Sequence, residues 1–155
     1  MQVFNSKDVR NIAVAGHGDH GKTSLTAAML RTAGVTNRLT RVDEGNTVTD
    51  FDEEEIARKV SISSALAHIE WNKVKLNLID TPGYNIFIND AKAAMIAADC
   101  ALIVVDAVAG PEVQTEKVWS YAEEYGIPRI LFINKMARER ANFDAALASV
   151  KEHLG

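Results

Sequence analysis

Apolar residues along this chain form two kinds of pattern, short continuous runs and stripes with helical spacing. The continuous runs predict strands at Val9–Ala15, Val60–Trp71, Val74–Asp80, Ala101–Asp106 and Arg129–Asn134. Stripes with apolar residues at i, i+3, i+4 and i+7 predict helices over about 21–33, 87–98, 112–125 and 143–154. Because strands alternate with helices, the pattern predicts an α/β fold with helices on both faces of a sheet.

The connection between the second and third predicted strands is unusually short. Only Asn72 and Lys73 separate them, and a two-residue connection requires an antiparallel hairpin. The other strands are separated by helices, which favours parallel pairing. The sequence therefore predicts a three-layer sandwich whose sheet is mostly parallel, with one antiparallel edge strand.

The stretch from Val35 to Lys59 is polar, charged and without periodicity. A loop of this length inside a compact domain is uncommon, and such loops are mostly functional or disordered. The acidic run Asp52–Glu55 within it has the composition of a metal cluster. Four consecutive acids more often form a solvated face or the start of a helix, so we favour that interpretation.

Composition places the chain among ordinary globular domains. Its 155 residues are 47% apolar and 25% charged, which predicts one domain over residues 1–155. The net charge of −4 predicts no direct nucleic-acid surface, and no apolar run is long enough for a membrane span. The single cysteine, Cys100, predicts a buried, reduced thiol and a cytoplasmic protein.

Candidate chemistry concentrates at residues 16–23, which read Gly-His-Gly-Asp-His-Gly-Lys-Thr and match the spacing G-x-x-x-x-G-K-[ST]. Between a strand and a helix, such a loop turns backbone N–H groups around the phosphates of a nucleotide. Lys22 is expected to reach the β- and γ-phosphates, and the Thr23 hydroxyl to ligate Mg²⁺. The predicted phosphate contacts are Gly16, His17, Gly18, Asp19, His20, Gly21, Lys22, Thr23 and Ser24.

A phosphate loop alone leaves adenine and guanine nucleotides, kinases and switch proteins all open. Two later motifs narrow the choice. Residues 80–83, Asp-Thr-Pro-Gly, have the D-x-x-G form of GTPases, and 134–136, Asn-Lys-Met, resemble the start of the N-K-x-D guanine motif. Together the motifs resemble the translational GTPases, and most of all the nucleotide-binding domain of elongation factor G and its paralogues. The resemblance implies a P-loop NTPase fold that binds GTP or GDP with Mg²⁺.

The resemblance also implies roles for individual residues. Asp80 would hold Mg²⁺ through water, the Gly83 N–H would meet the γ-phosphate, and Asn134 and Lys135 would frame the guanine base. Residues 58–62 resemble the family's R-G-I-T-I segment, which makes 35–61 the first switch and Ser61 a Mg²⁺ ligand beside Thr23 and Asp80. The catalytic candidates are Lys22, Gly83 and Tyr84.

By resemblance, the chain is expected to be a GTP-hydrolysing switch domain of a ribosome-associated factor in translation. No arginine finger is identifiable in the sequence, so we expect hydrolysis to be slow in isolation and to depend on the ribosome. The family continues with another strand and further domains. We therefore interpret the chain as a G domain truncated at its C-terminus, in which an open sheet edge would allow self-association.

Three positions depart from the family pattern. Tyr84 stands where the family commonly has a histidine that orients the attacking water, and Gly18 where it often has a bulky apolar residue. Ala137 replaces the aspartate of N-K-x-D, which we expect to cost roughly 3–6 kcal/mol of guanine binding because two charge-assisted hydrogen bonds are lost. These departures keep open a catalytically weak P-loop module with impaired guanine recognition, and less readily an ATPase or kinase.

Overall fold

The computed structural model describes residues 3–155 and contains a five-stranded sheet. The strand order is β2-β3-β1-β4-β5, and β2 pairs antiparallel with β3 while the other pairs are parallel. The strands are β1 (Val9–Ala15), β2 (Ala65–Trp71), β3 (Val74–Asp80), β4 (Cys100–Asp106) and β5 (Arg129–Asn134). The predicted α/β sandwich with one antiparallel edge strand is therefore confirmed.

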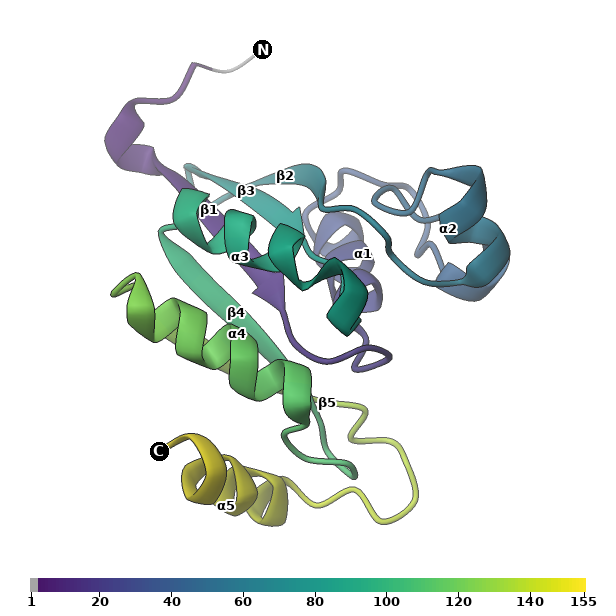
Figure 1. The fold of residues 1–155 in the computed structure, drawn as a ribbon. Coiled ribbons are helices and arrows are strands. Elements are labelled where there is room, and N and C mark those ends of the chain that lie inside the picture. Colours follow the sequence, from purple (N-terminus) through teal and green to yellow (C-terminus); the bar gives the residue numbers. More distant parts are fainter. Residues whose placement is uncertain (1–2) are drawn as a thin grey trace.

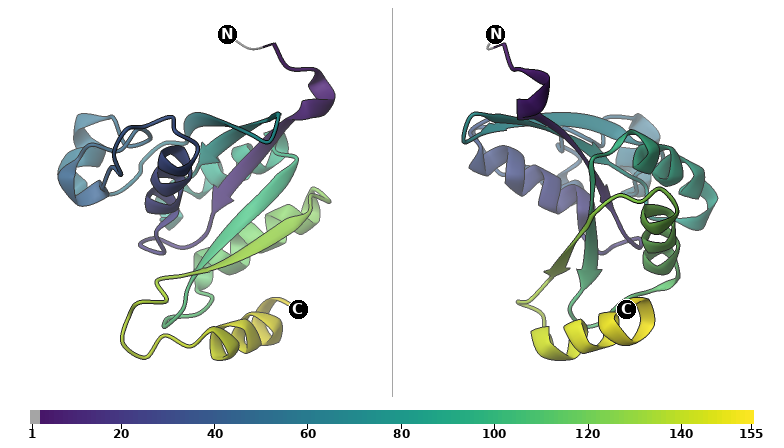
Figure 2. Two further views of the ribbon diagram at one scale, coloured as in Figure 1. Left: turned by 180° about the vertical axis from the view of Figure 1, so that it is seen from behind. Right: turned by 90° about the vertical axis from the view of Figure 1, so that its left-hand side faces the viewer.

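Helices cover both faces of this sheet. One face carries α1 (Lys22–Thr32), and the other carries α3 (Ile88–Ala97) and α4 (Val113–Glu124), as Figures 1 and 2 show. The last helix, α5 (Phe143–Leu154), packs beside α4 and β5. The larger core lies under α3 and α4, where Ala91, Met95 and Val118 pack against alternate residues of β1 and β4. The core thus fixes the central strands, whose carboxyl ends carry the candidate chemistry.

The hairpin between β2 and β3 forms as predicted. Asn72 and Lys73 have φ of 48° and 67°, so both lie in the left-handed region. Two consecutive left-handed residues are typical of a type I′ turn, whose twist matches that of the strands on either side.

The stretch predicted to lack periodicity contains two short helices. A 3-10 helix spans Val42–Glu44, and α2 spans Glu53–Arg58. Asp52 caps α2 by accepting the N–H of Glu54 at 2.8 Å, and the Glu55 carboxylate accepts the N–H of Asp52 at 3.4 Å. This capping box confirms the interpretation of the acidic run as a helix start.

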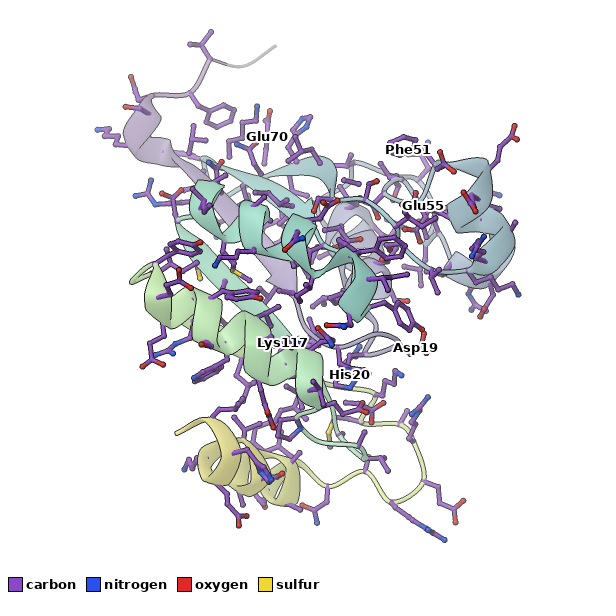
Figure 3. All side chains as sticks on the ribbon, in the orientation of Figure 1. Asp19, His20, Phe51, Glu55, Glu70 and Lys117 are labelled. Atoms are coloured by element: carbon purple, nitrogen blue, oxygen red, sulfur yellow. The ribbon has the colours of Figure 1, made fainter. Side chains whose placement is uncertain are left out.

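The second strand starts later than predicted, at Ala65 instead of Val60. Glu55 explains the difference, because its carboxylate accepts the N–H groups of Ile62 at 2.8 Å and Ser63 at 3.1 Å. Those amides are therefore unavailable to a strand. Glu55 is only 3% exposed, whereas its neighbour Phe51 is 74% exposed; both lie in the α2 region of Figure 3.

The strand β5 is less buried than its apolar sequence predicts. Ile130 is 53% exposed and Phe132 is 39% exposed, on the face of the sheet that carries α1. Within residues 3–155, β5 pairs with β4 alone, so its outer edge has no strand partner. Self-association through this edge stays a prediction. Cys100 is half-buried, not buried as predicted, because it opens a strand that the core covers fully only further along.

None of the helices in the described part of the chain is both long and apolar enough to cross a membrane.

Candidate functional site

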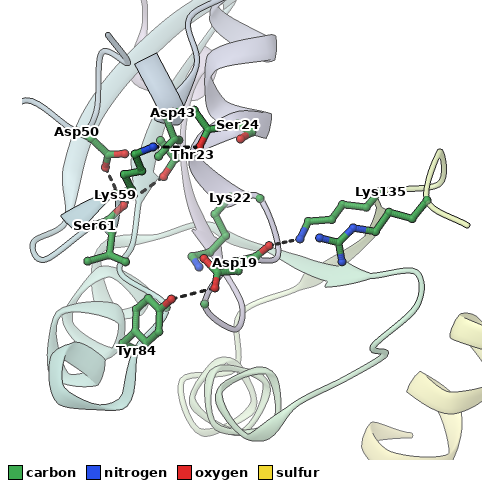
Figure 4. A pocket seen from close by; sticks show the side chains of 16 residues that line it. Asp19, Lys22, Thr23, Ser24, Asp43, Asp50, Lys59, Ser61, Tyr84 and Lys135 are labelled. Atoms are coloured by element: carbon green, nitrogen blue, oxygen red, sulfur yellow. Dashed lines mark hydrogen bonds and ion pairs between the residues drawn. The ribbon is translucent and has the colours of Figure 1, made fainter. Parts of the chain in front are cut away.

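The predicted site residues come together at the carboxyl end of the sheet, and most of them line a cavity of about 400 Å³ (Figure 4). The predicted residues that do not line it are Gly16, His17, His20, Asp80 and Asn134. Parallel register places Asp80, the last residue of β3, level with Val14 of β1. Asp106 and Asn134, which are level with each other, end β4 and β5 further along the same edge of the sheet. The loop after β1 therefore faces the ends of three other strands, which is where ligands bind in open α/β sheets.

Two glycines shape the loop at residues 16–21. Gly16 has φ of 142°, and a Cβ there would clash with the carbonyl oxygen of Val104. Gly21 has φ of 91°, and a Cβ there would lie 2.5 Å from Nδ2 of Asn134. Both positions combine a left-handed backbone with close neighbours, so larger residues would displace the loop from the sheet.

Lys22 begins α1 and lies within the site with 6% of its side chain exposed. Its Nζ donates to the carbonyl oxygen of His17 at 2.8 Å. Burial lowers the pKa of Lys22 to about 8, although the nearby Asp80 carboxylate opposes this shift. A buried ammonium with one neutral acceptor is well placed to receive an anionic ligand.

Asp80 is a buried charged group of the site whose carboxylate is only partly satisfied. It is 2% exposed, its Oδ2 accepts the Thr49 hydroxyl at 2.8 Å, and its Oδ1 has no hydrogen-bond partner. Burial raises the pKa of Asp80 to about 6, against the opposing effects of Thr49 and Lys22. An unpartnered buried carboxylate oxygen is free to interact with a cation or a hydrogen-bond donor.

Hydroxyl groups lie close to this carboxylate. Thr23 Oγ1 lies 3.2 Å from Ser61 Oγ, and the Ser61 hydroxyl donates to Asp50 Oδ1 at 2.7 Å. Burial raises the pKa of Asp50, and the bond from Ser61 opposes the shift. Hydroxyls and carboxylates are the oxygen ligands that Mg²⁺ prefers, so the residues present fit this ion.

The sequence motifs do not identify two residues of this cluster. Thr49 and Asp50 lie inside the long polar stretch, where no motif or periodicity marks them. They are 3% and 4% exposed, respectively, because the segment that contains them folds over the ends of the strands.

At the other end of the site, Asn134 and Lys135 brace the phosphate loop. Asn134 Nδ2 donates to the carbonyl oxygen of His20 at 2.9 Å, and Lys135 Nζ donates to that of Asp19. Ala137 is exposed in the turn that follows and presents no polar side-chain atom. The next residue, Arg138, lines the cavity, a placement that its sequence position alone does not reveal.

The Asp106 carboxylate holds Lys135 and Arg138 in place. Its carboxylate accepts the N–H groups of Val108 and Ala109 and pairs with Lys135 at 3.1 Å and Arg138 at 2.9 Å. Burial alone would raise the pKa of Asp106, but these donors outweigh it and lower the pKa to about 2.

Comparison with known proteins places this chain in a family. The family model for the elongation factor Tu GTP-binding domain matches residues 7–155. The chain belongs to this family.

Relatives within this GTP-binding family include translation factors. The chain is 44% identical over 146 residues to elongation factor G 2 of Streptomyces coelicolor and 42% identical over 149 residues to the mitochondrial ribosome-releasing factor 2 of Culex quinquefasciatus. The matches cover 94% and 96% of this chain but 21% and 20% of the relatives. A crystal structure of a Thermus thermophilus protein superposes with a TM-score of 0.90 at 36% identity, covering 94% of this chain and 22% of that one. The chain thus spans about a fifth of the length of these proteins.

Histidines in the phosphate loop of this GTP-binding domain pair with the helix that follows β4. His20, 2% exposed, has Nδ1 3.1 Å from the Val104 carbonyl oxygen and Nε2 2.7 Å from a Glu112 carboxylate oxygen. Both ring nitrogens therefore face acceptors. Nε2 of His17 lies 3.7 Å from the same carboxylate, and His20 lies beside the start of α4 in Figure 3. These contacts hold the loop against α4.

The two remaining departures from the family pattern, Gly18 and Tyr84, lie against each other. Gly83 and Tyr84 line the cavity on the side of the loop that carries Gly18. Ser24, also predicted to contact nucleotide, is exposed at the cavity wall. The structure thus brings every predicted site residue to one end of the sheet.

Proposed function

We propose that this chain is a GTP-binding and GTP-hydrolysing switch domain of an elongation-factor-G-type protein, with the ribosome as its partner. The single observation that carries the proposal is the buried Asp80 carboxylate, which lies near Lys22 and Thr23 and has one oxygen without a hydrogen-bond partner. Such a group is costly unless a cation and an anionic ligand complete the site. The names of the relatives, elongation factor G 2 and ribosome-releasing factor 2, support the ribosome as partner.

Each group has a role in this proposal. Residues Gly16 to Ser24 hold the phosphates, with Lys22 balancing their charge. Thr23 and Ser61 ligate Mg²⁺, and Asp80 holds it through water. Asn134 and Lys135 frame the guanine base, and the Gly83 N–H contacts the γ-phosphate. When bound, Mg²⁺ neutralises charge on the phosphate oxygens.

We expect GTP hydrolysis by the isolated chain to be slow, because no free arginine among residues 3–155 is available at the cavity to stabilise the transition state. Phosphoryl transfer depends on positioning and on stabilising charge in the transition state. Arg138 is the arginine that lines the cavity, and its guanidinium already donates to Asp106. We therefore expect the ribosome to supply the further stabilisation of charge that the transition state needs. A cytoplasmic location stays a prediction, because the relatives include mitochondrial proteins.

The test combines binding with a readout of the switch. In Mg²⁺, calorimetry should show GDP and GTP binding that ATP does not displace, and single-turnover assays should show slow phosphate release. GTP should protect residues 35–61 from protease more than GDP does, because Ser61 joins the metal and γ-phosphate end of the site. Equal cleavage with both nucleotides would contradict a switch, and displacement by ATP would contradict guanine specificity.

The affinity for Mg²⁺·GDP is expected to depend on pH in a bell shape. Below about pH 6, Asp80 in the free chain is protonated and must lose its proton to interact with Mg²⁺. Above about pH 8, Lys22 in the free chain is neutral and must gain a proton to pair with phosphate. The dissociation constant should therefore be lowest between these values and rise by up to about tenfold per pH unit outside them.

Calorimetric titrations from pH 5 to pH 9 measure this dependence. The Asp80→Asn variant serves as the control, since it removes the titrating carboxyl and should flatten the acid limb after the nucleotide's own titration is subtracted. An acid limb of equal slope in both proteins would show that Asp80 does not control it.

A further inference from the structure

The segment after β3 crosses the phosphate loop at Gly18 with no room for side chains between the two backbones. A Cβ built on Gly83 would lie 2.7 Å from the Gly18 nitrogen and 2.8 Å from its Cα, and it would also clash with Lys22 Nζ. Both glycines are buried. Gly83 therefore lies directly over Lys22, the residue expected to reach the β- and γ-phosphates.

The ring of Tyr84 occupies the space where a side chain on Gly18 would lie. A Cβ on Gly18 would come 2.8 Å from Cζ, 3.0 Å from Cε1 and 3.1 Å from Cε2 of Tyr84. Gly18 is not among the glycines with positive φ, so its backbone would accept alanine. The tyrosine ring, and not backbone conformation, is what excludes a side chain at this position.

The phenol group fixes the ring in this place. Its hydroxyl, bonded to Cζ, donates to Asp19 Oδ2 at 3.0 Å, so the residue next to Gly18 holds the same, hydroxyl-bearing end of the ring (Figure 4). Burial and the Asp19 carboxylate both raise the pKa of Tyr84. The hydroxyl consequently remains a donor throughout the neutral range.

We propose that Gly18 and Asp19 form a seat for Tyr84, and that the seated tyrosine is a positioning residue that holds Gly83 over Lys22 and so favours GTP over GDP. The inference rests on the proposed GTPase function. A third phosphate would be contacted by both Lys22 and the Gly83 backbone, whereas the phosphates of GDP are held by the loop itself. Displacement of the Tyr84 ring from the seat therefore affects the contact made with the third phosphate more than the contacts that the loop makes with the other two.

The seat is tested directly in the chain labelled with 3-fluorotyrosine. The chain has three tyrosines, so fluorine NMR should give three resonances, of which Tyr84→Phe identifies one. Gly18→Ala should shift that resonance and leave those of Tyr121 and Tyr125, on α4 and at its end, in place. A Tyr84 resonance that stays unchanged in the folded Gly18→Ala protein would overturn the proposal.

The consequence for nucleotide selection is tested by a double-mutant cycle. Gly18→Ala should reduce the ratio of GTP to GDP affinity by about tenfold, which is within the range of coupling between residues in contact. In a Tyr84→Ala background, the same substitution should change the ratio by less than about twofold, because the ring that it displaces is absent. Equal effects in both backgrounds would refute the coupling.

Tyr84→Phe separates the two halves of the seat, because it keeps the ring over Gly18 and removes only the hydroxyl bond to Asp19. The ratio should then fall by less than in Gly18→Ala. The outcomes also separate this inference from the proposed function. If the parent chain binds neither GTP nor GDP, the proposed GTPase function is contradicted, and the NMR result still decides whether Gly18 and Asp19 form a seat for Tyr84. If both nucleotides bind but Gly18→Ala leaves the ratio of GTP to GDP affinity unchanged, only the proposed role of the seat is contradicted.

Discussion

Replacing Ala137 with aspartate is expected to tighten GDP binding by a factor of about a hundred to ten thousand. The side chains just before and after position 137, Asn134, Lys135 and Arg138, offer amide and cationic donors, and Asp106 already accepts from its own partners. Guanine presents two donors, N1–H and the exocyclic amine, that need an acceptor. A carboxylate at 137 would supply two charge-assisted hydrogen bonds, worth roughly 3–6 kcal/mol.

Calorimetry of the parent chain and the Ala137→Asp variant with GDP measures this gain. Ala137→Asn is the matched control, because it has nearly the same size but no charge and should gain much less. Inosine diphosphate, which lacks the exocyclic amine, should also gain less than GDP in the aspartate variant. Equal GDP affinity in all three proteins would show that position 137 does not face the base.

Asparagine at position 80 is expected to stabilise the nucleotide-free chain by about 1–2 kcal/mol near pH 7.5 and to weaken the effect of Mg²⁺ on nucleotide affinity. Burial raises the pKa of Asp80 above its unfolded value. Its contribution to stability is therefore present below about pH 4 and is lost as the pH rises through about 6. An uncharged amide avoids that loss, but it cannot attract the cation, which should cost a factor of roughly 10–100 in Mg²⁺-dependent affinity.

Asp106→Asn is a matched control, for which we expect a change in stability of the opposite sign. Asp106 ends the strand β4 as Asp80 ends β3, and both are nearly fully buried, but Asp106 has four donors. Its pKa is lowered, so its stabilising contribution is present above about pH 4 and is lost as the pH falls through about 2. Removing its charge should destabilise the chain by about 1–3 kcal/mol.

Thermal unfolding of both variants without nucleotide, at pH 7.5, checks the two signs. The midpoint should rise by about 2–8 °C for Asp80→Asn and fall for Asp106→Asn. Destabilisation by both substitutions would mean that the environment of Asp80 satisfies its charge after all.

The sequence was sufficient to predict the sheet and the end of it that carries the site. Buried strands such as Ala101–Asp106 are continuous apolar runs, and the phosphate loop has a fixed spacing between a strand and a helix, so both can be read locally. The two-residue hairpin at Asn72 and Lys73 likewise determines its own pairing.

Features that depend on long-range contacts could not be predicted in this way. The late start of β2 reflects the Glu55 carboxylate, which takes the amides of residues 62 and 63 from seven and eight positions away. Asp50 joins the Mg²⁺-compatible cluster only because its segment folds over the strand ends. The contact between Gly18 and Tyr84 joins residues 66 positions apart, and neither residue alone indicates it.

The helix α2 is too short to persist on its own, since a six-residue helix in water does not repay the cost of its first turn. Its cap and the backbone that follows it both depend on one buried carboxylate, that of Glu55. When the Glu55 carboxylate leaves its buried position, α2 and the segment that follows it lose these hydrogen bonds together. Residues 53–63 should therefore behave as one foldon, whose amide protons exchange with solvent through a single shared opening of low free energy.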